Sequence, residues 1–166
     1  IGDFTARIGD PTGKDTARQT LSKNQVKENM KNYLNQVYKI VPKGSLDIKY
    51  NSKWLEKMSL ADIINLGSYF TVQQMLARDM FQKRLQDQKP ISQNEFLYPL
   101  LQGYDSVAME VDGEIGGNDQ TFNMLVGRDL VKKLLEKEKI VITTKLLENP
   151  ENGKKLMNKS EGHYIS

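Results

Sequence analysis

Three polar side chains, those of Tyr98, Gln102 and Asp105, recur at the spacing of one helix face and could bind a small polar ligand. Ser92 and Glu95 form the pattern of a capping box, which predicts that this helix begins at Ser92. Apolar residues occupy most of its other positions, so we expect it to be buried. A buried amide and a buried carboxylate need hydrogen-bond partners, which either the protein or a ligand supplies.

A second polar group follows the paired glycines Gly116 and Gly117, where Asp119 and Gln120 head another predicted helix. Paired glycines let the backbone turn or approach a ligand closely. Free backbone N–H groups and a carboxylate at a helix start suit the hydroxyls of a sugar or the polar end of a small molecule. The two stretches indicate a pocket for a polar ligand with an apolar body. A capped helix pair with a satisfied core carboxylate is the alternative.

A turn near the start of the chain carries both a carboxylate and cations. It runs from Gly9 through Asp10 to Lys14, and Arg18 follows. A glycine-containing turn after a strand can hold phosphates when basic residues lie beyond it. This turn lacks the glycine spacing and the Lys-Ser/Thr pair of a Walker A loop, and a simple turn is the alternative interpretation.

Composition and charge limit the class of protein. The 166 residues are 38% hydrophobic and 27% charged, which is ordinary for a globular domain. The net charge of +3 and the pI near 8.9 indicate an anionic partner only weakly. The absence of cysteine excludes disulfides and thiolate metal sites, and the single histidine, His163, argues against a histidine-rich metal site or a Ser/His/Asp triad.

The chain ends and the hydropathy predict a cytoplasmic fragment. The chain opens on Ile1 without a methionine and closes on Ser166 without a tail, so we expect a piece of a longer protein. We find no apolar run of membrane-spanning length and no signal peptide. A cytoplasmic protein without membrane contact is therefore the default expectation.

Strand and helix patterns alternate along the chain and predict an α/β fold with a largely parallel sheet. β-type residues predict buried strands at 1–8 and 139–144, and strict alternation predicts a half-exposed strand at 46–50. Apolar periodicity and cap residues predict the helices outside the two polar stretches: residues 22–41, a short one at Trp54–Leu55, one from Ser59 that breaks at Gly67, and one from Thr71 to Pro90.

Four motifs, taken in order, carry a family resemblance. They are GDFTARIGDPTGK at 2–14, YPLLQGYDS at 98–106, EIGGNDQTFN at 114–123, and MNKS at 157–160 before Tyr164. Together they resemble the catalytic domain of bacterial tyrosyl-tRNA synthetases, and the match covers essentially the whole chain. The second and third motifs are similar to the tyrosyl type rather than to the related tryptophanyl enzymes.

The resemblance implies a Rossmann-like class I synthetase catalytic fold, present in part, with a helical insertion. It also implies an ATP-dependent ligase that activates L-tyrosine as tyrosyl-adenylate and transfers it to tRNA(Tyr). Asp105 matches the position that accepts a hydrogen bond from the substrate phenol. Positions around the substrate ammonium group match Asp10, Tyr98 and Gln102, and the position near its carboxylate matches Gln120.

For ATP the resemblance implies a second set of residues. Gly117 and Asp119 match positions that hold the ribose. Basic residues that act on the pyrophosphate, and that we take as catalytic, match Lys14, Arg18 and Lys159. Lys159 belongs to the phosphate-clamping signature loop, here 153–161. Mg²⁺ is expected with the ATP, without a metal site made by the protein itself.

The helices at about 52–90 match the family's connective insertion, which forms the dimer interface and touches the acceptor end of the tRNA. The resemblance therefore implies a homodimer of the longer protein and tRNA(Tyr) as a partner.

Departures from the family pattern leave a second hypothesis open. The histidine-containing ATP signature lies ahead of residue 1, and Leu156 stands where the family usually has a lysine. His163 replaces a usual asparagine. The alternative is a non-catalytic, synthetase-derived module that binds tyrosine, RNA or a protein partner.

Overall fold

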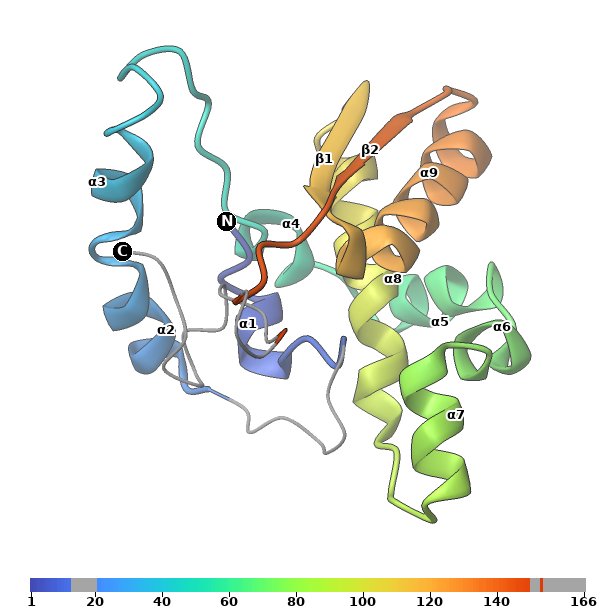
Figure 1. Cartoon of the computed structure of the whole chain (residues 1–166). Helices are drawn as coiled ribbons and strands as arrows, with labels where there is room; N and C mark the ends of the chain where they lie inside the picture. Colours follow the sequence, from blue (N-terminus) through green and yellow to red (C-terminus); the bar gives the residue numbers. More distant parts are fainter. Residues whose placement is uncertain (13–20, 150–152, 154–166) are drawn as a thin grey trace.

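The computed structural model describes residues 1–12, 21–149 and 153. Helices predominate, and two short strands run side by side (Figure 1). In chain order the elements are α1 (Thr5–Ile8), α2 (Lys23–Met30), α3 (Tyr33–Val37), α4 (Ser52–Leu55), α5 (Leu60–Ser68), α6 (Val72–Leu76), α7 (Asp79–Gln86), α8 (Gln93–Ala108), β1 (Gly113–Gly117), the 3₁₀ helix η1 (Asn118–Gln120), α9 (Thr121–Leu135) and β2 (Ile140–Thr144).

The strands β1 and β2 form a parallel pair in which Gly113 lies opposite Ile140 and Gly117 lies opposite Thr144. Parallel strands need a crossover connection, and α9 supplies it. The prediction of an α/β arrangement with parallel pairing is therefore confirmed. The described part of the chain holds no third strand.

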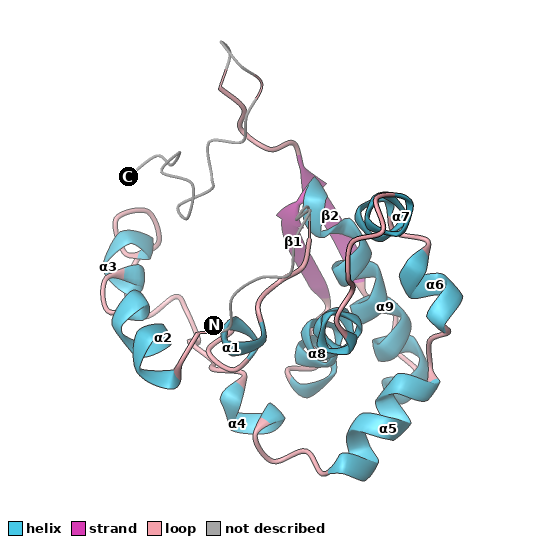
Figure 2. Cartoon of the chain, turned by 90° about the horizontal axis from the view of Figure 1, so that it is seen from below, coloured by secondary structure: helices cyan, strands magenta, loops and turns pink. Residues whose placement is uncertain are grey.

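The long helices α8 and α9 pack closely against each other, because glycines lie where they cross. α9 also contacts both strands of the sheet. A Cβ atom on Gly103 would lie 2.8 Å from Val126 Cγ1 and 3.0 Å from the backbone nitrogen of Gly127. Figure 2 shows α5, α6 and α7 arranged around this pair, with α2 and α3 standing apart. The buried core lies where these helices meet: Leu55, Leu66, Met75, Leu100, Leu101, Val126 and Leu130.

A buried ion pair joins α7 to the start of α8. Arg84 Nη1 lies 2.6 Å from Glu95 Oε2, with side-chain exposures of 0% and 5%. Burial raises the pKa of Glu95, but hydrogen bonds from Arg84 and from the Ser92 backbone N–H outweigh it, so this pKa lies below its ordinary value. Glu95 is therefore held as a carboxylate, and it fixes the entry of the chain into α8.

The predicted helix starts at Ser22, Ser59, Thr71 and Ser92 are confirmed. In each, the side chain three residues later accepts a hydrogen bond from the cap residue's backbone N–H, at 2.7 to 2.9 Å. These local bonds satisfy N–H groups that the helix leaves free. Because they join residues three positions apart, such helix starts can be predicted from the sequence.

Two predicted strands are wrong. In the first of them, Thr5–Ile8 form the short helix α1 instead, because Ala6 N donates to Gly2 O and Gly9 N donates to Thr5 O. Residues 46–50 are extended but form no strand. Within the described part of the chain, their backbone bond to a distant segment comes from Ile1, whose nitrogen donates to Lys49 O at 2.6 Å.

Other boundaries differ from the prediction. The helix expected at 22–41 is instead two helices, α2 and α3, with a break at Lys31–Asn32. Asparagine favours such a break because it is a weak helix former. The helix expected from Thr71 breaks at Arg78, whose backbone is extended. The break expected at Gly67 comes after Ser68. β2 is confirmed as a strand, but it is not buried, since Ile140 is 66% exposed. The described sheet has two strands and leaves the outward side chains of β2 uncovered.

Candidate functional site

Asp105 on α8 is held by two neutral donors from the α4 region. Trp54 Nε1 donates to Asp105 Oδ1 at 2.8 Å, and Asn51 Nδ2 donates to Asp105 Oδ2 at 3.1 Å. Each carboxylate oxygen has two lone pairs, so the described residues leave one acceptor site on each oxygen for a ligand hydroxyl.

Burial raises the pKa of Asp105 to about 6, and this effect exceeds that of the hydrogen bonds from Trp54 and Asn51, which lower it. The negative charge of Glu114 raises this pKa as well. A carboxyl group of this kind changes its protonation state just below neutral pH, so its hydrogen bonding to a ligand depends on pH.

Asn51 links three segments around Asp105 and is only 1% exposed. Its Oδ1 accepts from the Phe4 backbone N–H at 2.9 Å, and its Nδ2 also donates to Thr5 Oγ1 at 3.1 Å. The first residues of the chain, α4 and α8 therefore meet at one side chain, which holds Asp105 in place.

A second polar cluster lies on the neighbouring turn of α8. Gln120 Nε2 donates to Asp10 Oδ2 at 2.9 Å. Asn123 Nδ2 donates to Gln102 Oε1 at 2.9 Å and to Gln120 Oε1 at 3.1 Å. The fold thus brings together three predicted site residues, Asp10, Gln102 and Gln120, from three separate elements.

Gly117 and Asp119 lie at the carboxyl end of β1, the end of a parallel strand where ligands commonly bind. A Cβ atom on Gly117 would lie 2.7 Å from Asp119 Oδ1 and 2.7 Å from Leu146 Cδ2. A side chain at this position would collide with both, so Gly117 lets the Asp119 carboxylate and Leu146 pack against the backbone.

The other predicted residues are placed in part. Tyr98 lies one turn before Gln102 on α8 and is half-buried. Lys14, Arg18 and Lys159 lie outside the described residues, as does the predicted loop 153–161 except for Gly153.

Arg78 is a cation of the site that the sequence analysis missed. Its Nη2 donates to Thr12 Oγ1 at 3.0 Å, and its guanidinium carbon lies 4.5 Å from the centre of the Phe122 ring. Its Nη1 is buried and has no hydrogen-bond partner among the described residues. Burial lowers the pKa of Arg78, and the charge of Asp10 partly offsets this. Arg78 therefore stands beside Asp10 with a donor available.

Three more residues were missed, and only one had a usable signal. Asn123 follows Gln120 at helical spacing, so the periodicity that selected Tyr98 and Gln102 could have selected it as well. Asn51 and Trp54 precede Asp105 by 54 and 51 positions, and no spacing rule connects residues so far apart.

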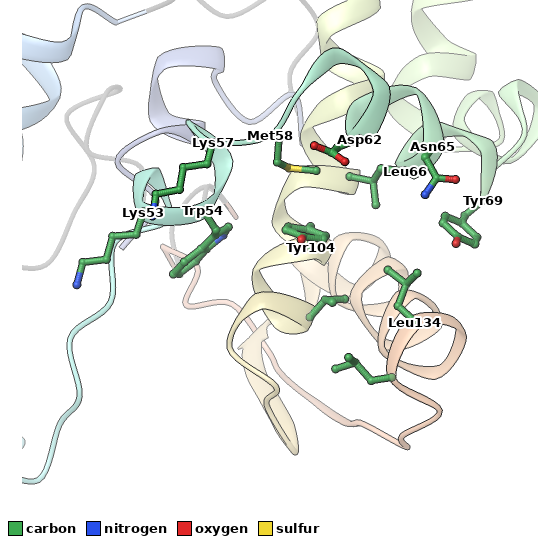
Figure 3. Close-up of a pocket in the computed structure, with 12 residues that line it drawn as sticks. Lys53, Trp54, Lys57, Met58, Asp62, Asn65, Leu66, Tyr69, Tyr104 and Leu134 are labelled. Atoms are coloured by element: carbon green, nitrogen blue, oxygen red, sulfur yellow. The ribbon is translucent and has the colours of Figure 1, made fainter.

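Figure 3 shows a groove of about 610 Å³ between α4, α5, α8 and α9. Trp54 lines it together with Lys53, Lys57, Tyr69 and Tyr104. None of the predicted site residues lines this groove, so the candidate site lies elsewhere, around Asp105 and the amide cluster.

Within residues 1–12, 21–149 and 153, no group of three or more His, Cys, Asp or Glu side chains could hold a metal ion. No helix in this described part is both long and apolar enough to cross a membrane.

Comparison with known proteins places the sequence and the fold in one family. The sequence profile described as "tRNA synthetases class I (W and Y)" matches residues 1–166. The chain is 50% identical to the tyrosine–tRNA ligase of Nitrosospira multiformis over 165 residues, which is 99% of this chain and 41% of that protein. It is 52% identical to the tyrosine–tRNA ligase of Helicobacter pylori strain 26695 over 166 residues, or 99% of this chain and 41% of that protein.

A solved structure extends the comparison to the fold. The C-terminally truncated mitochondrial tyrosyl-tRNA synthetase of Coccidioides posadasii superposes with a TM-score of 0.69 at 27% identity, covering 93% of this chain and 50% of that chain. The predicted Rossmann-like class I synthetase fold is thereby confirmed.

The chain is part of a class I aminoacyl-tRNA synthetase catalytic domain. It belongs to the tRNA synthetases class I (W and Y), and its curated relatives are tyrosine–tRNA ligases, which confirms the resemblance predicted from the four motifs. The chain spans about 41% of the length of these relatives.

Proposed function

We propose that these residues form the tyrosine-binding part of a tyrosine–tRNA ligase, which activates L-tyrosine with ATP and transfers it to tRNA(Tyr). The observation that carries the proposal is Asp105, a largely buried carboxyl group with neutral donors on both oxygens. Keeping a charge in such a place is costly unless a ligand uses it.

In this proposal Asp105 accepts a hydrogen bond from the tyrosine phenol. A site built to bond a substrate hydroxyl rejects the analogue that lacks it by roughly 10⁴–10⁵. Phenylalanine would leave the Asp105 carboxylate buried without that donor. Discrimination would therefore need no separate editing step.

The amide cluster would receive the amino-acid end of the substrate. Asp10, with Tyr98 and Gln102, would surround the ammonium group, and Gln120 would lie near the carboxylate. The bond from Gln120 to Asp10 and the bridge through Asn123 support this, because they align the acceptors and donors before a ligand arrives.

ATP would bind beyond the amino acid, with its ribose at Gly117 and Asp119. The absence of a side chain at Gly117 supports this, because it lets the Asp119 carboxylate lie directly against the end of β1. Adenylation needs positioning and charge neutralisation more than a general base. The catalytic basic residues Lys14, Arg18 and Lys159 would act on the phosphates, with Mg²⁺ carried by ATP itself.

The insertion at about 52–90 would form the homodimer interface of the longer protein and touch the acceptor end of tRNA(Tyr). Large apolar side chains are exposed on its helices α5 to α7, which supports a contact surface there: Leu60 at 76%, Ile64 at 65%, Val72 at 60% and Leu85 at 48%. A translation enzyme acts where ribosomes work, so the expectation of a cytoplasmic protein goes with this proposal.

The decisive experiment is calorimetric binding of L-tyrosine and L-phenylalanine to the chain and to Asp105→Asn. We expect tyrosine to bind, phenylalanine not to bind, and the variant to lose the preference. Asp112→Asn, whose exposed carboxylate pairs with Lys137, is the matched control and should keep it. A folded chain that binds neither amino acid would contradict the proposed pocket. Tyrosine binding without tyrosine-dependent pyrophosphate exchange in a longer chain would favour a non-catalytic module.

A further inference from the structure

Arg78 extends from the helical insertion to the turn that carries Asp10. It lies between α6 and α7, just before the first residue of α7. Its Nη2 donates to Thr12 Oγ1 at 3.0 Å, although the two residues are 66 positions apart in the sequence. The backbone N–H of Thr12 donates to Asp10 Oδ1 at 2.9 Å. Arg78 is therefore joined to the Asp10 carboxylate through a single residue.

The guanidinium group of Arg78 is restrained on more than one side. Its carbon lies 4.5 Å from the centre of the Phe122 ring on α9 and 5.6 Å from the centre of the Phe81 ring on α7. Aromatic rings attract a guanidinium group at such distances. Its Nη1 is buried. The side chain is thus ordered by these contacts, and its bond to Thr12 costs little further side-chain entropy.

The Asp10 carboxylate is bonded through both of its oxygens. Oδ1 accepts from the Thr12 N–H, and Oδ2 accepts from Gln120 Nε2 at 2.9 Å. Gln120 is held in turn by Asn123, whose Nδ2 donates to Gln120 Oε1 at 3.1 Å. On the Thr12 side, the corresponding support among the described residues is the bond from Arg78. The orientation of Asp10 therefore depends on one contact from α9 and one from the insertion.

Resting on the proposed role of Asp10 at the substrate ammonium group, we propose that Arg78 is a positioning residue, which holds Thr12 so that the Asp10 carboxylate faces the ammonium group of tyrosine. Asp10 contacts the substrate, and Arg78 acts through Thr12. A misplaced acceptor lowers the affinity for ligands that carry the ammonium group and leaves the other parts of the ligand in their places.

The first test needs no ligand. Hydrogen exchange at the Thr12 backbone N–H reports its bond to Asp10, because exchange requires that bond to open. We would compare the chain with Arg78→Met, Thr12→Val and the double variant, after correction for the intrinsic exchange rate of each residue. We expect exchange at position 12 to be about tenfold faster in each single variant. The double variant should show no further increase, because both side chains act through one bond.

Two control variants separate positioning from general loosening of the fold. Arg128→Met removes an exposed arginine of α9 and should leave exchange at Thr12 unchanged. Arg84→Met removes a buried arginine of α7 and should speed exchange throughout the core without singling out Thr12. Arg78→Lys keeps a charged donor and should restore part of the protection. If Arg78→Met speeds exchange at Thr12 no more than at the core amides of α8, the proposal is overturned.

The second test separates the ammonium group from the rest of the substrate. Calorimetry would compare L-tyrosine with 3-(4-hydroxyphenyl)propionate, which keeps the phenol and the carboxylate but lacks the ammonium group. We expect Arg78→Met to weaken tyrosine binding by about tenfold and to leave binding of the propionate unchanged. An equal loss for both ligands would overturn the proposal, because a purely structural role, or a direct bond from Arg78 to the substrate carboxylate, predicts that result.

If Arg78→Met fails to fold, Thr12→Val decides, and unchanged exchange at position 12 in that variant overturns the proposal. Failure of the proposed function gives a different result. If exchange rises as expected in a chain that binds no tyrosine, the proposed function is contradicted, while the hold of Arg78 on the Asp10 turn is supported.

Discussion

Two carboxyl groups on α8, those of Glu95 and Asp105, are largely buried, but their pKa values are shifted in opposite directions. Glu95 lies beside the Arg84 guanidinium, and its pKa lies below the ordinary value. The donors to Asp105 among the described residues, Asn51 and Trp54, are neutral, and its pKa is raised to about 6. Pairing with a cation favours the ionised form of a buried carboxyl group, whereas neutral partners leave burial to raise its pKa, and we propose that Asp105 uses this carboxyl group to bind a ligand.

We expect the largest effect when the cation that pairs with Glu95 is removed. Arg84→Met leaves the Glu95 carboxylate buried without its cation, which we expect to cost about 3–5 kcal/mol in the free energy of unfolding. Urea unfolding at pH 7 measures this. The control is Lys89→Met, which removes an exposed cation paired with Asp87. A loss no larger than in that control would mean that Glu95 is not held by charge pairing.

The second prediction concerns the sign of the pH dependence at Asp105. Its folded pKa of about 6 lies above the ordinary 3.8, so between these values the folded state holds a proton that the unfolded state has lost. The contribution of Asp105 to stability is complete below pH 3.8 and falls as pH rises through 6. The roughly two-unit difference corresponds to about 3 kcal/mol.

Urea unfolding of wild type and Asp105→Asn from pH 3.5 to 8 tests this sign. The stability of wild type relative to the variant should fall as pH rises. Glu95→Gln should show the opposite sign, because a lowered folded pKa contributes stability that is lost as pH falls through it. If both differences change with pH in the same direction, the contrast between the two carboxyl groups is wrong.

The smallest effect concerns a single neutral donor. Trp54→Phe removes the indole N–H bonded to Asp105, and we expect the pKa of Asp105 to rise further, by about 1 unit. Carbon-detected NMR titration of the Asp105 carboxyl group measures it. Tyr104→Phe, which changes a side chain in the same groove, is the control. An unmoved midpoint would show that the indole supports Asp105 sterically and not by hydrogen bonding.

Local signals in the sequence predicted much of the helical framework. The cap residues at Ser22, Ser59, Thr71 and Ser92 mark true helix starts, because their hydrogen bonds close within four residues. The strands predicted at 1–8 and 46–50 failed for the converse reason. A strand needs a partner strand elsewhere in the chain, and residues 46–50 have none among the described residues, where Ile1 gives them a single backbone bond.

For the candidate site, the sequence by itself determined that Tyr98, Gln102 and Asp105 share a face of α8 and that Asp119 and Gln120 lie between β1 and the next long helix. It also determined the family, through four motifs in a fixed order. Only the tertiary structure decided that Trp54 and Asn51 hold Asp105, that Asn123 bridges the amides, and that Lys139 meets Glu114. Helical periodicity is set by bonds between near neighbours, whereas these contacts join residues far apart in the chain, and packing alone brings them together.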